Sequence, residues 1–113
     1  MLFKNKKTKE TFDEFLSDIS KIVDMYMLKR SKKKGISYTG GECEISINSK
    51  KSNWLDISIV LYGKLKNEKW IKDKLLLKRP LKSFKDNDET KAKLEQIKNA
   101  PMKIQVAATD SEV

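Results

Sequence analysis

The stretch "WLDISIVLY", Trp54 to Tyr62, carries a branched aliphatic residue at every second position. Successive side chains of a β-strand point to opposite faces, so these residues share one face of a predicted strand. They are Leu55, Ile57, Ile59 and Leu61. A strand with one continuous aliphatic face needs another layer to cover it, and the stretch therefore predicts a sheet that is packed on that side.

Two flanking segments show the same period of two. Upstream, "ECEISIN", residues 42–48, alternates in this way, and "KKSN" after it is a plausible hairpin connection. Downstream, a turn over residues 63–68 leads to a third strand over residues 70–78, and Pro80 ends it because proline cannot donate to a ladder. Sequential strands joined by short turns pair antiparallel, so the three segments predict a meander.

A long amphipathic helix precedes the strands. Thr11 and Glu14 have the spacing of a capping box, with Thr8 as an alternative start. The helix is expected to run to about Lys29, with Gly35 ending the turn that follows. Its apolar residues recur at steps of three and four, which places them on one stripe. They are Phe12, Phe15, Leu16, Ile19, Ile22, Val23 and Tyr26. This stripe is wide enough to cover the aliphatic face of the sheet.

The C-terminal part predicts a weaker helix and a possible fourth strand. In "DNDETKAKLEQIKNA", residues 86–100, Asp86 or Asp88 is the expected N-cap, and Pro101 closes the helix before "MKIQV", residues 102–106. The predicted fold is α+β, a single small basic domain over residues 1–113. A three- to four-stranded antiparallel meander sheet packs on the N-terminal helix, in the order helix, three strands, helix and possible strand. The alternative is a small, partly closed β-barrel, if the fourth strand bends back along the first.

Composition excludes several classes of function. The chain has no histidine and one cysteine, Cys43, which removes most metal sites, most acid–base chemistry and any intramolecular disulfide. Cys43 lies in an alternating strand, where it is expected to be a small buried residue. We therefore expect no enzyme and no cofactor. No apolar run is long enough for a signal peptide or a membrane span, which predicts a cytoplasmic protein.

The net charge of +9 comes from 23 Lys and two Arg against 16 acidic residues, and it is unevenly distributed. Residues 11–28 carry a net charge of −3, residues 29–34 carry +5, and residues 63–85 have nine bases against two acids. A field of this sign attracts phosphates or acidic proteins. If both basic segments lie at one side of the sheet, they form a single patch that would release counterions on meeting a phosphate backbone.

The third strand combines lysines with aromatic residues. Strand parity predicts that Trp54, Tyr62 and Trp70 share the face opposite the core with Lys72, Lys74 and Lys78, as in a platform for single-stranded nucleic acid. The competing interpretation is that the second helix or the terminal strand covers the apolar part of this face. In that case Trp70 is partly buried and keeps one edge accessible.

The order helix, three strands, helix is similar to that of double-stranded-RNA-binding domains, and Lys91 and Lys93 open the second helix as bases do in that family. The resemblance is limited to topology. The connection "KKSN" contains neither the Gly-Pro pair nor the His of the family's loop, and the first helix is unusually long.

These patterns predict a small nucleic-acid-binding or regulatory protein that contacts RNA or single-stranded DNA, with little sequence specificity, through phosphate contacts. The candidate binding residues are Lys29, Arg30, Lys32, Lys33, Lys34, Trp70, Lys72, Lys74, Lys78, Arg79 and Lys82. The alternative is a protein-interaction module, such as an inhibitor, an immunity-type protein or an accessory protein of a mobile element. It would bind an acidic partner through the same basic face.

Overall fold

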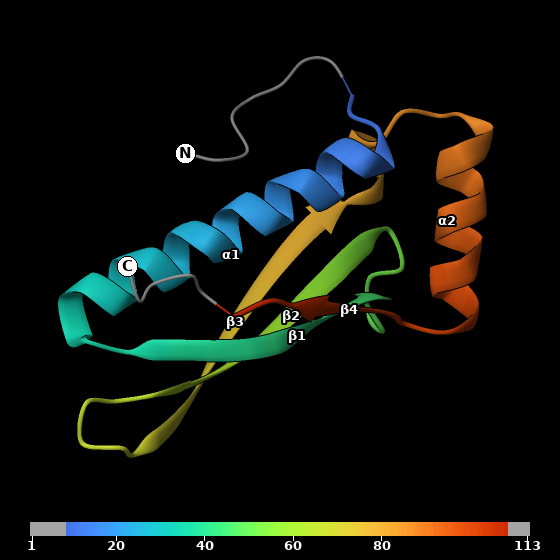
Figure 1. Ribbon diagram of the computed structural model, residues 1–113. Helices are drawn as coiled ribbons and strands as arrows, with labels where there is room; N and C mark the ends of the chain where they lie inside the picture. Colours follow the sequence, from blue (N-terminus) through green and yellow to red (C-terminus); the bar gives the residue numbers. More distant parts are fainter. Residues whose placement is uncertain (1–8, 109–113) are drawn as a thin grey trace.

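The computed structural model describes residues 9–108 (Figure 1). Its elements are α1 (Phe12–Lys34), β1 (Ser37–Ile47), β2 (Trp54–Lys64), β3 (Trp70–Pro80), a short 3-10 turn (Leu81–Ser83), α2 (Asp88–Asn99) and β4 (Met102–Val106). The strands form one sheet in the order β3-β2-β1-β4, and each neighbouring pair is antiparallel. The predicted α+β fold and the order of its elements are confirmed. The barrel alternative is wrong, because β3 and β4 remain as two separate edges of an open sheet.

The ends of α1 follow from local chemistry. The Glu14 amide donates to the Thr11 hydroxyl over 3.1 Å, and the Thr11 amide donates to the Glu14 carboxylate over 2.9 Å, so the predicted capping box is present. The alternative start, Thr8, lies outside the described residues. The helix continues past the predicted end at Lys29 to Lys34. Lysines in the last turn are favoured by the helix dipole, so the helix ends only at Gly35, which takes the left-handed conformation with φ of 66°.

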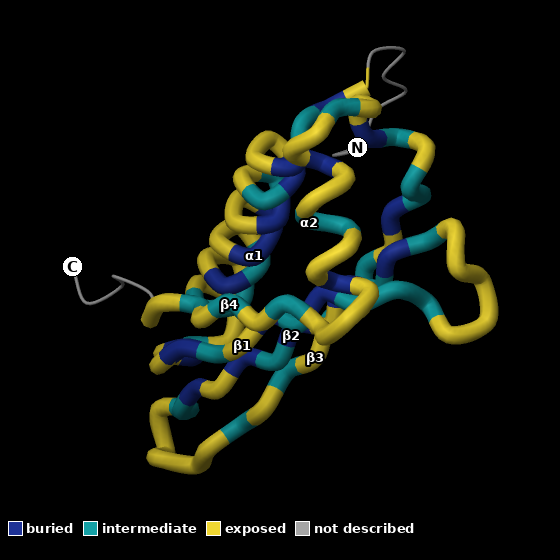
Figure 2. Tube along the Cα trace, turned by 90° about the vertical axis from the view of Figure 1, so that its right-hand side faces the viewer, coloured by how far each residue is buried: buried dark blue, intermediate teal, exposed yellow. Residues whose placement is uncertain are grey.

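Both helices pack on the same face of the sheet. The aliphatic residues of β2 that were predicted to be covered are at most 1% exposed, and Ile97 of α2 joins the same core as Phe15 of α1. At one end of this core, Phe12, Phe15 and Phe84 form a cluster with ring centroids 5.0 to 5.5 Å apart. Figure 2 shows the buried residues between the helices and the sheet, whereas the other face of the sheet carries no described helix.

Two boundaries differ from the prediction. The first strand begins at Ser37 rather than at residue 42, so "TGG", residues 39–41, lies inside β1. The pairing of β1 with β2 shifts by one residue between Tyr38 and Gly40, so Thr39 has no direct partner in the register. The N-cap of α2 is Asn87 instead of Asp86 or Asp88, because the Asn87 side chain accepts the Thr90 amide over 2.8 Å.

Candidate nucleic-acid interface

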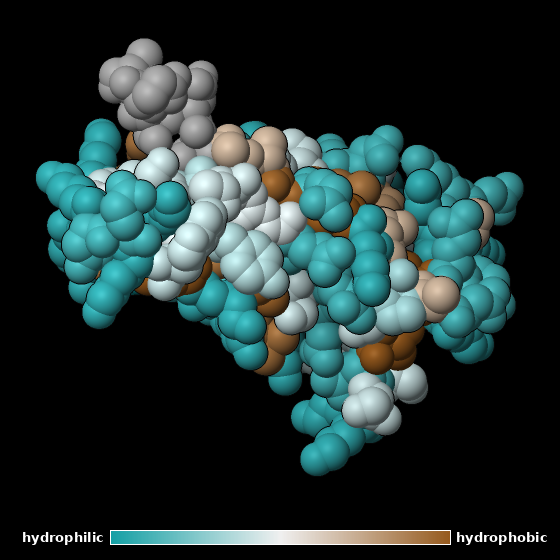
Figure 3. Space-filling view, turned by 60° about the horizontal axis from the view of Figure 1, so that its bottom comes forward, coloured by the Kyte–Doolittle hydropathy of each residue, from teal (hydrophilic) through white to brown (hydrophobic). Residues whose placement is uncertain are grey.

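The face of the sheet opposite the helices is the candidate interface, and we call it the open face. Strand register arranges its side chains in rows across the sheet. Tyr62 of β2 lies between Lys72 of β3 and Gly40 of β1, and the next row contains Lys74, Val60 and Glu42. Figure 3 brings this side of the molecule forward and shows a mainly hydrophilic surface with small apolar patches.

Trp70 is exposed on the open face. Its relative exposure is 62%, and the Lys64 ammonium lies 5.0 Å from the centroid of its ring. The interpretation in which α2 covers Trp70 is therefore wrong. The reason is that α2 packs beside α1 on the opposite face, where it contacts β1 and α1.

Tyr62 is the second accessible aromatic residue on this face, and it is 45% exposed. Trp70 pairs with Lys64, so Tyr62 is its diagonal neighbour on the adjacent strand, at a distance of about 7–8 Å. Trp54 lies on the same face but is only partly exposed, and it pairs with Pro80 at the far end of the strands. That position is about 25 Å from Tyr62, at roughly 3.3 Å per residue. The accessible aromatic pair is therefore Trp70 and Tyr62.

The lysines predicted on β3 are all exposed on the open face. Lys72, Lys74 and Lys78 are exposed, and each is opposite a β2 residue of that face in the register. Because β3 is an edge strand, the long lysine side chains border open solvent along the length of the sheet. Lys82 follows in the 3-10 turn and is also exposed, but it lies at the opposite end of β3 from Trp70.

The two basic segments meet at one end of the molecule. The space beside Gly35, directly after α1, is occupied by the side chain of Lys66 from the β2–β3 turn: a Cβ at Gly35 would lie 2.8 Å from the Lys66 Cε. Figure 1 shows the end of α1 and this turn at the same end of the sheet. We call the cluster the basic end. Its members are Lys32, Lys33, Lys34, Lys64, Lys66, Lys69 and Lys72. Lys29, also exposed, precedes it by one helical turn.

Arg30 holds the end of α1 against the sheet. Its Nε lies 3.2 Å from a carboxylate oxygen of Asp73 and donates to the Tyr38 hydroxyl over 3.3 Å. The Tyr38 hydroxyl donates to Asp73 over 2.6 Å, and burial together with this hydrogen bond raises the pKa of Tyr38 to about 12. The guanidinium also lies 5.7 Å from the centroid of the Tyr26 ring. Arg30 thus positions the lysines that follow it, instead of projecting freely from the surface.

Arg79 lies on the covered face and does not reach the open face. Its side chain is 7% exposed and pairs with Glu10, whose side chain is 4% exposed. Burial lowers the pKa of the Arg79 guanidinium. Strand parity puts Arg79 on the same side of β3 as Leu75 and Leu77, and this signal separates it from the other candidate residues, although the selection of Arg79 as a binding residue did not use it.

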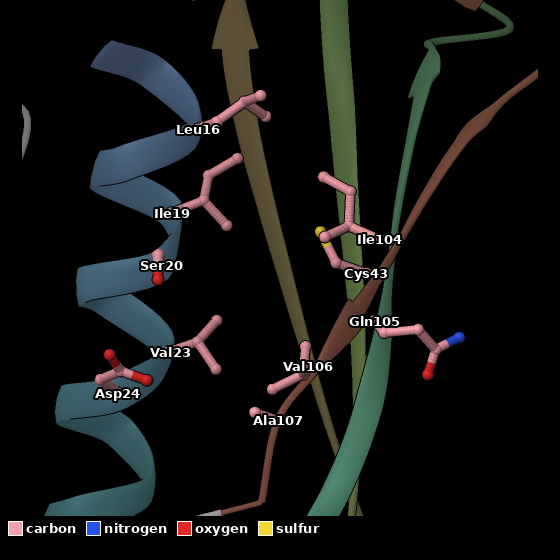
Figure 4. A pocket seen from close by; sticks show the side chains of 10 residues that line it. All are labelled: Leu16, Ile19, Ser20, Val23, Asp24, Cys43, Ile104, Gln105, Val106 and Ala107. Atoms are coloured by element: carbon pink, nitrogen blue, oxygen red, sulfur yellow. The ribbon is translucent and has the colours of Figure 1, made fainter. Parts of the chain in front are cut away.

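A hollow between α1 and the β1–β4 edge has a volume of about 410 Å³ and a mainly aliphatic lining (Figure 4). Cys43 contributes to this lining and is 2% exposed, and burial raises the pKa of its thiol to about 11. The predicted burial of this residue is confirmed. Figure 4 also shows that the Gln105 side chain points away from α1 and from this hollow.

Among residues 9–108, neither helix has the length and hydropathy required to cross a membrane. In the same part of the chain, no three His, Cys, Asp or Glu residues gather closely enough to hold a metal ion. Comparisons of the chain with protein-family models, with curated proteins and with solved structures found no match.

Proposed function

We propose that this chain is a small cytoplasmic nucleic-acid-binding protein that binds RNA or single-stranded DNA through its open face and its basic end. The proposal is carried by one observation: the lysines of the basic end border two accessible aromatic rings, Trp70 and Tyr62, on a sheet face that no described element covers. A positive groove or edge beside stacking side chains is the combination that proteins use to bind single strands.

The exposure of the rings favours a single strand over a duplex. Each base of a single strand offers a free π-face, whereas the bases of a duplex are stacked on one another. Trp70 and Tyr62 are diagonal neighbours at about 7–8 Å, a separation at which two different bases of one strand can each meet a ring. Lys72 lies directly opposite Tyr62 and can contact the phosphate of a base that stacks there.

The distribution of charge favours the approach of a nucleic acid from the side of the open face. The acidic residues Asp13, Asp18 and Asp24 lie on α1, on the other side of the molecule from the open face. A phosphate backbone is therefore attracted to the lysine side and repelled from the outer side of α1. Neutralisation of several phosphates releases counterions, so the affinity should fall steeply with salt and depend little on sequence.

The test is a fluorescence anisotropy titration of labelled RNA, single-stranded DNA and duplex DNA, each of about 12 nucleotides, at about 50 mM and about 200 mM salt. The double variant Lys32→Gln/Lys33→Gln removes two charges from the basic end. The matched control Lys50→Gln/Lys51→Gln removes two exposed charges from the β1–β2 turn, at the opposite end of the sheet. We expect tighter binding to single strands, and a shallower salt dependence for the first variant only.

Two results would overturn this proposal. The first is the absence of binding to every oligonucleotide at the lower salt concentration. The second is an equal loss of affinity in the two double variants, which would mean that only the net charge matters. If no oligonucleotide binds and an acidic protein stays bound in a pull-down after nuclease treatment, the protein-interaction module is the better assignment.

A further inference from the structure

A second hollow lies on the open face next to Tyr62, with a volume of about 360 Å³. Tyr62, Gly40, Gly41, Glu42 and Gln105 contribute to its lining. The hollow forms where β4 stops: Val106, the last residue of β4, pairs with Gly41, so the β1 residues before Gly41 have no pairing partner in β4. Its volume lies at the lower end of the range for small-ligand sites.

Gly40 and Gly41 line this hollow at positions where the neighbouring strands leave no room for a side chain. A Cβ at Gly41 would lie 2.1 Å from the Val60 carbonyl oxygen, a distance that the backbone does not allow. Gly40 has φ of 136°, and a Cβ there would approach the Val106 carbonyl oxygen to 3.0 Å. Glycine at these two positions thus lets β1 pass close to the backbones of β2 and β4 beside the hollow.

Two polar side chains at the hollow, Glu42 and Gln105, offer different hydrogen-bonding groups. Glu42 and Gln105 are direct partners in the β1–β4 register, so both belong to the open face, in agreement with the direction of Gln105 in Figure 4. A carboxylate only accepts hydrogen bonds, and it can take two donors side by side, whereas a glutamine amide can also donate. No ion pair between described residues engages the Glu42 carboxylate.

These groups match the Watson–Crick edge of guanine. Guanine presents two adjacent donors, N1–H and the N2 amine, beside the acceptor O6. Uracil presents a single N–H between two carbonyl oxygens, which a carboxylate would repel. Adenine and cytosine each present one amine beside an acceptor nitrogen. Single-strand recognition commonly reads this edge while the base stacks on an aromatic ring.

We propose that the hollow is a nucleobase site that prefers guanine within a single strand. The base stacks on Tyr62, its N1–H and N2 amine donate to Glu42, and its O6 accepts from the Gln105 amide. Lys72, opposite Tyr62, lies where it can contact the neighbouring phosphate. The inference rests on the proposed single-strand binding, and it explains why an acidic residue lies within a lysine-rich surface.

The test compares labelled oligouridine of about 12 nucleotides with the same strand carrying one central guanosine, inosine or adenosine. We expect the guanosine strand to bind about 5- to 30-fold more tightly than oligouridine, the lower part of the range for a bidentate base contact. Inosine lacks the N2 amine, so its strand should bind at an intermediate affinity. Adenosine should bind no better than inosine, because its edge offers the carboxylate a single amine.

Three variants test which residues cause the preference for guanosine. Glu42→Gln should reduce the guanosine preference to less than about 2-fold while leaving the affinity for oligouridine equal or slightly higher, because one negative charge is lost. Tyr62→Ala should weaken binding to both strands. Glu44→Gln is the matched control, since Glu44 is the next acid on the same face of β1, and it should keep the preference.

The outcomes separate this inference from the proposed function. If no oligonucleotide binds, the proposed function itself fails. If all strands bind with equal affinity, only the guanine site is refuted. A guanosine preference that survives Glu42→Gln, or that disappears equally in Glu44→Gln, would also refute the site. Glu42 and Tyr62 are exposed, so these variants should fold, and circular dichroism checks that they do.

Discussion

Replacement of Trp70 by alanine should weaken nucleic-acid binding and cost less stability than the loss of a fully buried tryptophan. Trp70 is 62% exposed, so about four-tenths of it is covered in the folded state. A large aromatic residue buries about 150–250 Å² when fully covered, which leaves roughly 60–100 Å² here. At about 25 cal/mol per Å², and allowing for a compact unfolded chain, the loss in unfolding free energy is about 1–2 kcal/mol. A fully buried tryptophan would cost about 3–5 kcal/mol.

The expected loss of affinity has a separate cause, the loss of base stacking on the Trp70 ring. Stacking of one base contributes about 1–3 kcal/mol, which corresponds to a fall in affinity of roughly 5- to 150-fold. Urea denaturation followed by circular dichroism measures the stability, and anisotropy with a labelled single strand measures the affinity. Trp54→Ala is the matched control. It removes the same side chain from a more buried position at the far end of the open face, and it should cost more stability and leave binding unchanged.

Two results would refute the reasoning about Trp70. A stability loss of about 3–5 kcal/mol in Trp70→Ala would mean that the side chain is packed and not exposed. An unchanged affinity, or an equal fall in affinity for Trp54→Ala, would mean that Trp70 is no stacking residue. Lys72→Glu in the same strand completes the set, because a solvated lysine should change stability by less than about 0.5 kcal/mol while weakening an electrostatic complex.

Three further predictions concern groups away from the open face. Arg79→Met should destabilise the fold by about 3–5 kcal/mol, because it leaves the buried Glu10 carboxylate without its ion-pair partner. The double variant with Glu10→Met should recover much of this loss in urea denaturation, and a single variant as stable as the wild type would contradict the burial of the pair. The raised pKa of Tyr38, about 12 against an ordinary value of 10.0, means that folding favours its neutral form. That contribution to stability is fully present below about pH 10 and is lost as the pH rises through about 12, so Tyr38→Phe should flatten the alkaline unfolding curve. Spectrophotometric titration should show a step near pH 12 that is lost in Tyr38→Phe, and the absence of that step in the wild type would be inconsistent with the hydrogen bond to Asp73. The Cys43 thiol, with its pKa raised to about 11 by burial, should react with iodoacetamide at neutral pH only after unfolding in urea, and rapid labelling of the native protein would show that the thiol is accessible.

The elements themselves could be predicted from local patterns in the sequence. The period of two in residues 54–62 and the three- and four-residue steps in residues 12–26 identify a strand and a helix, because each pattern places apolar side chains on one side of its element. The capping box at Thr11 and Glu14 and the stop at Gly35 depend only on neighbouring residues. The alternation of residues in β3 likewise indicates that Arg79 lies on the covered face.

The tertiary structure alone decided how these elements combine into a surface. The meeting of Gly35 with Lys66 joins segments about thirty positions apart, and the hollow beside Tyr62 requires β4 to pair with β1 and to stop at Val106. Trp70 is exposed because α2 packs on the opposite face of the sheet. The apolar residues of α2 do not specify which face of the sheet the helix covers. Periodicity shows which side of an element is apolar, but it gives no information on the distance between two elements. Those distances are set by packing between parts of the chain that are remote in sequence.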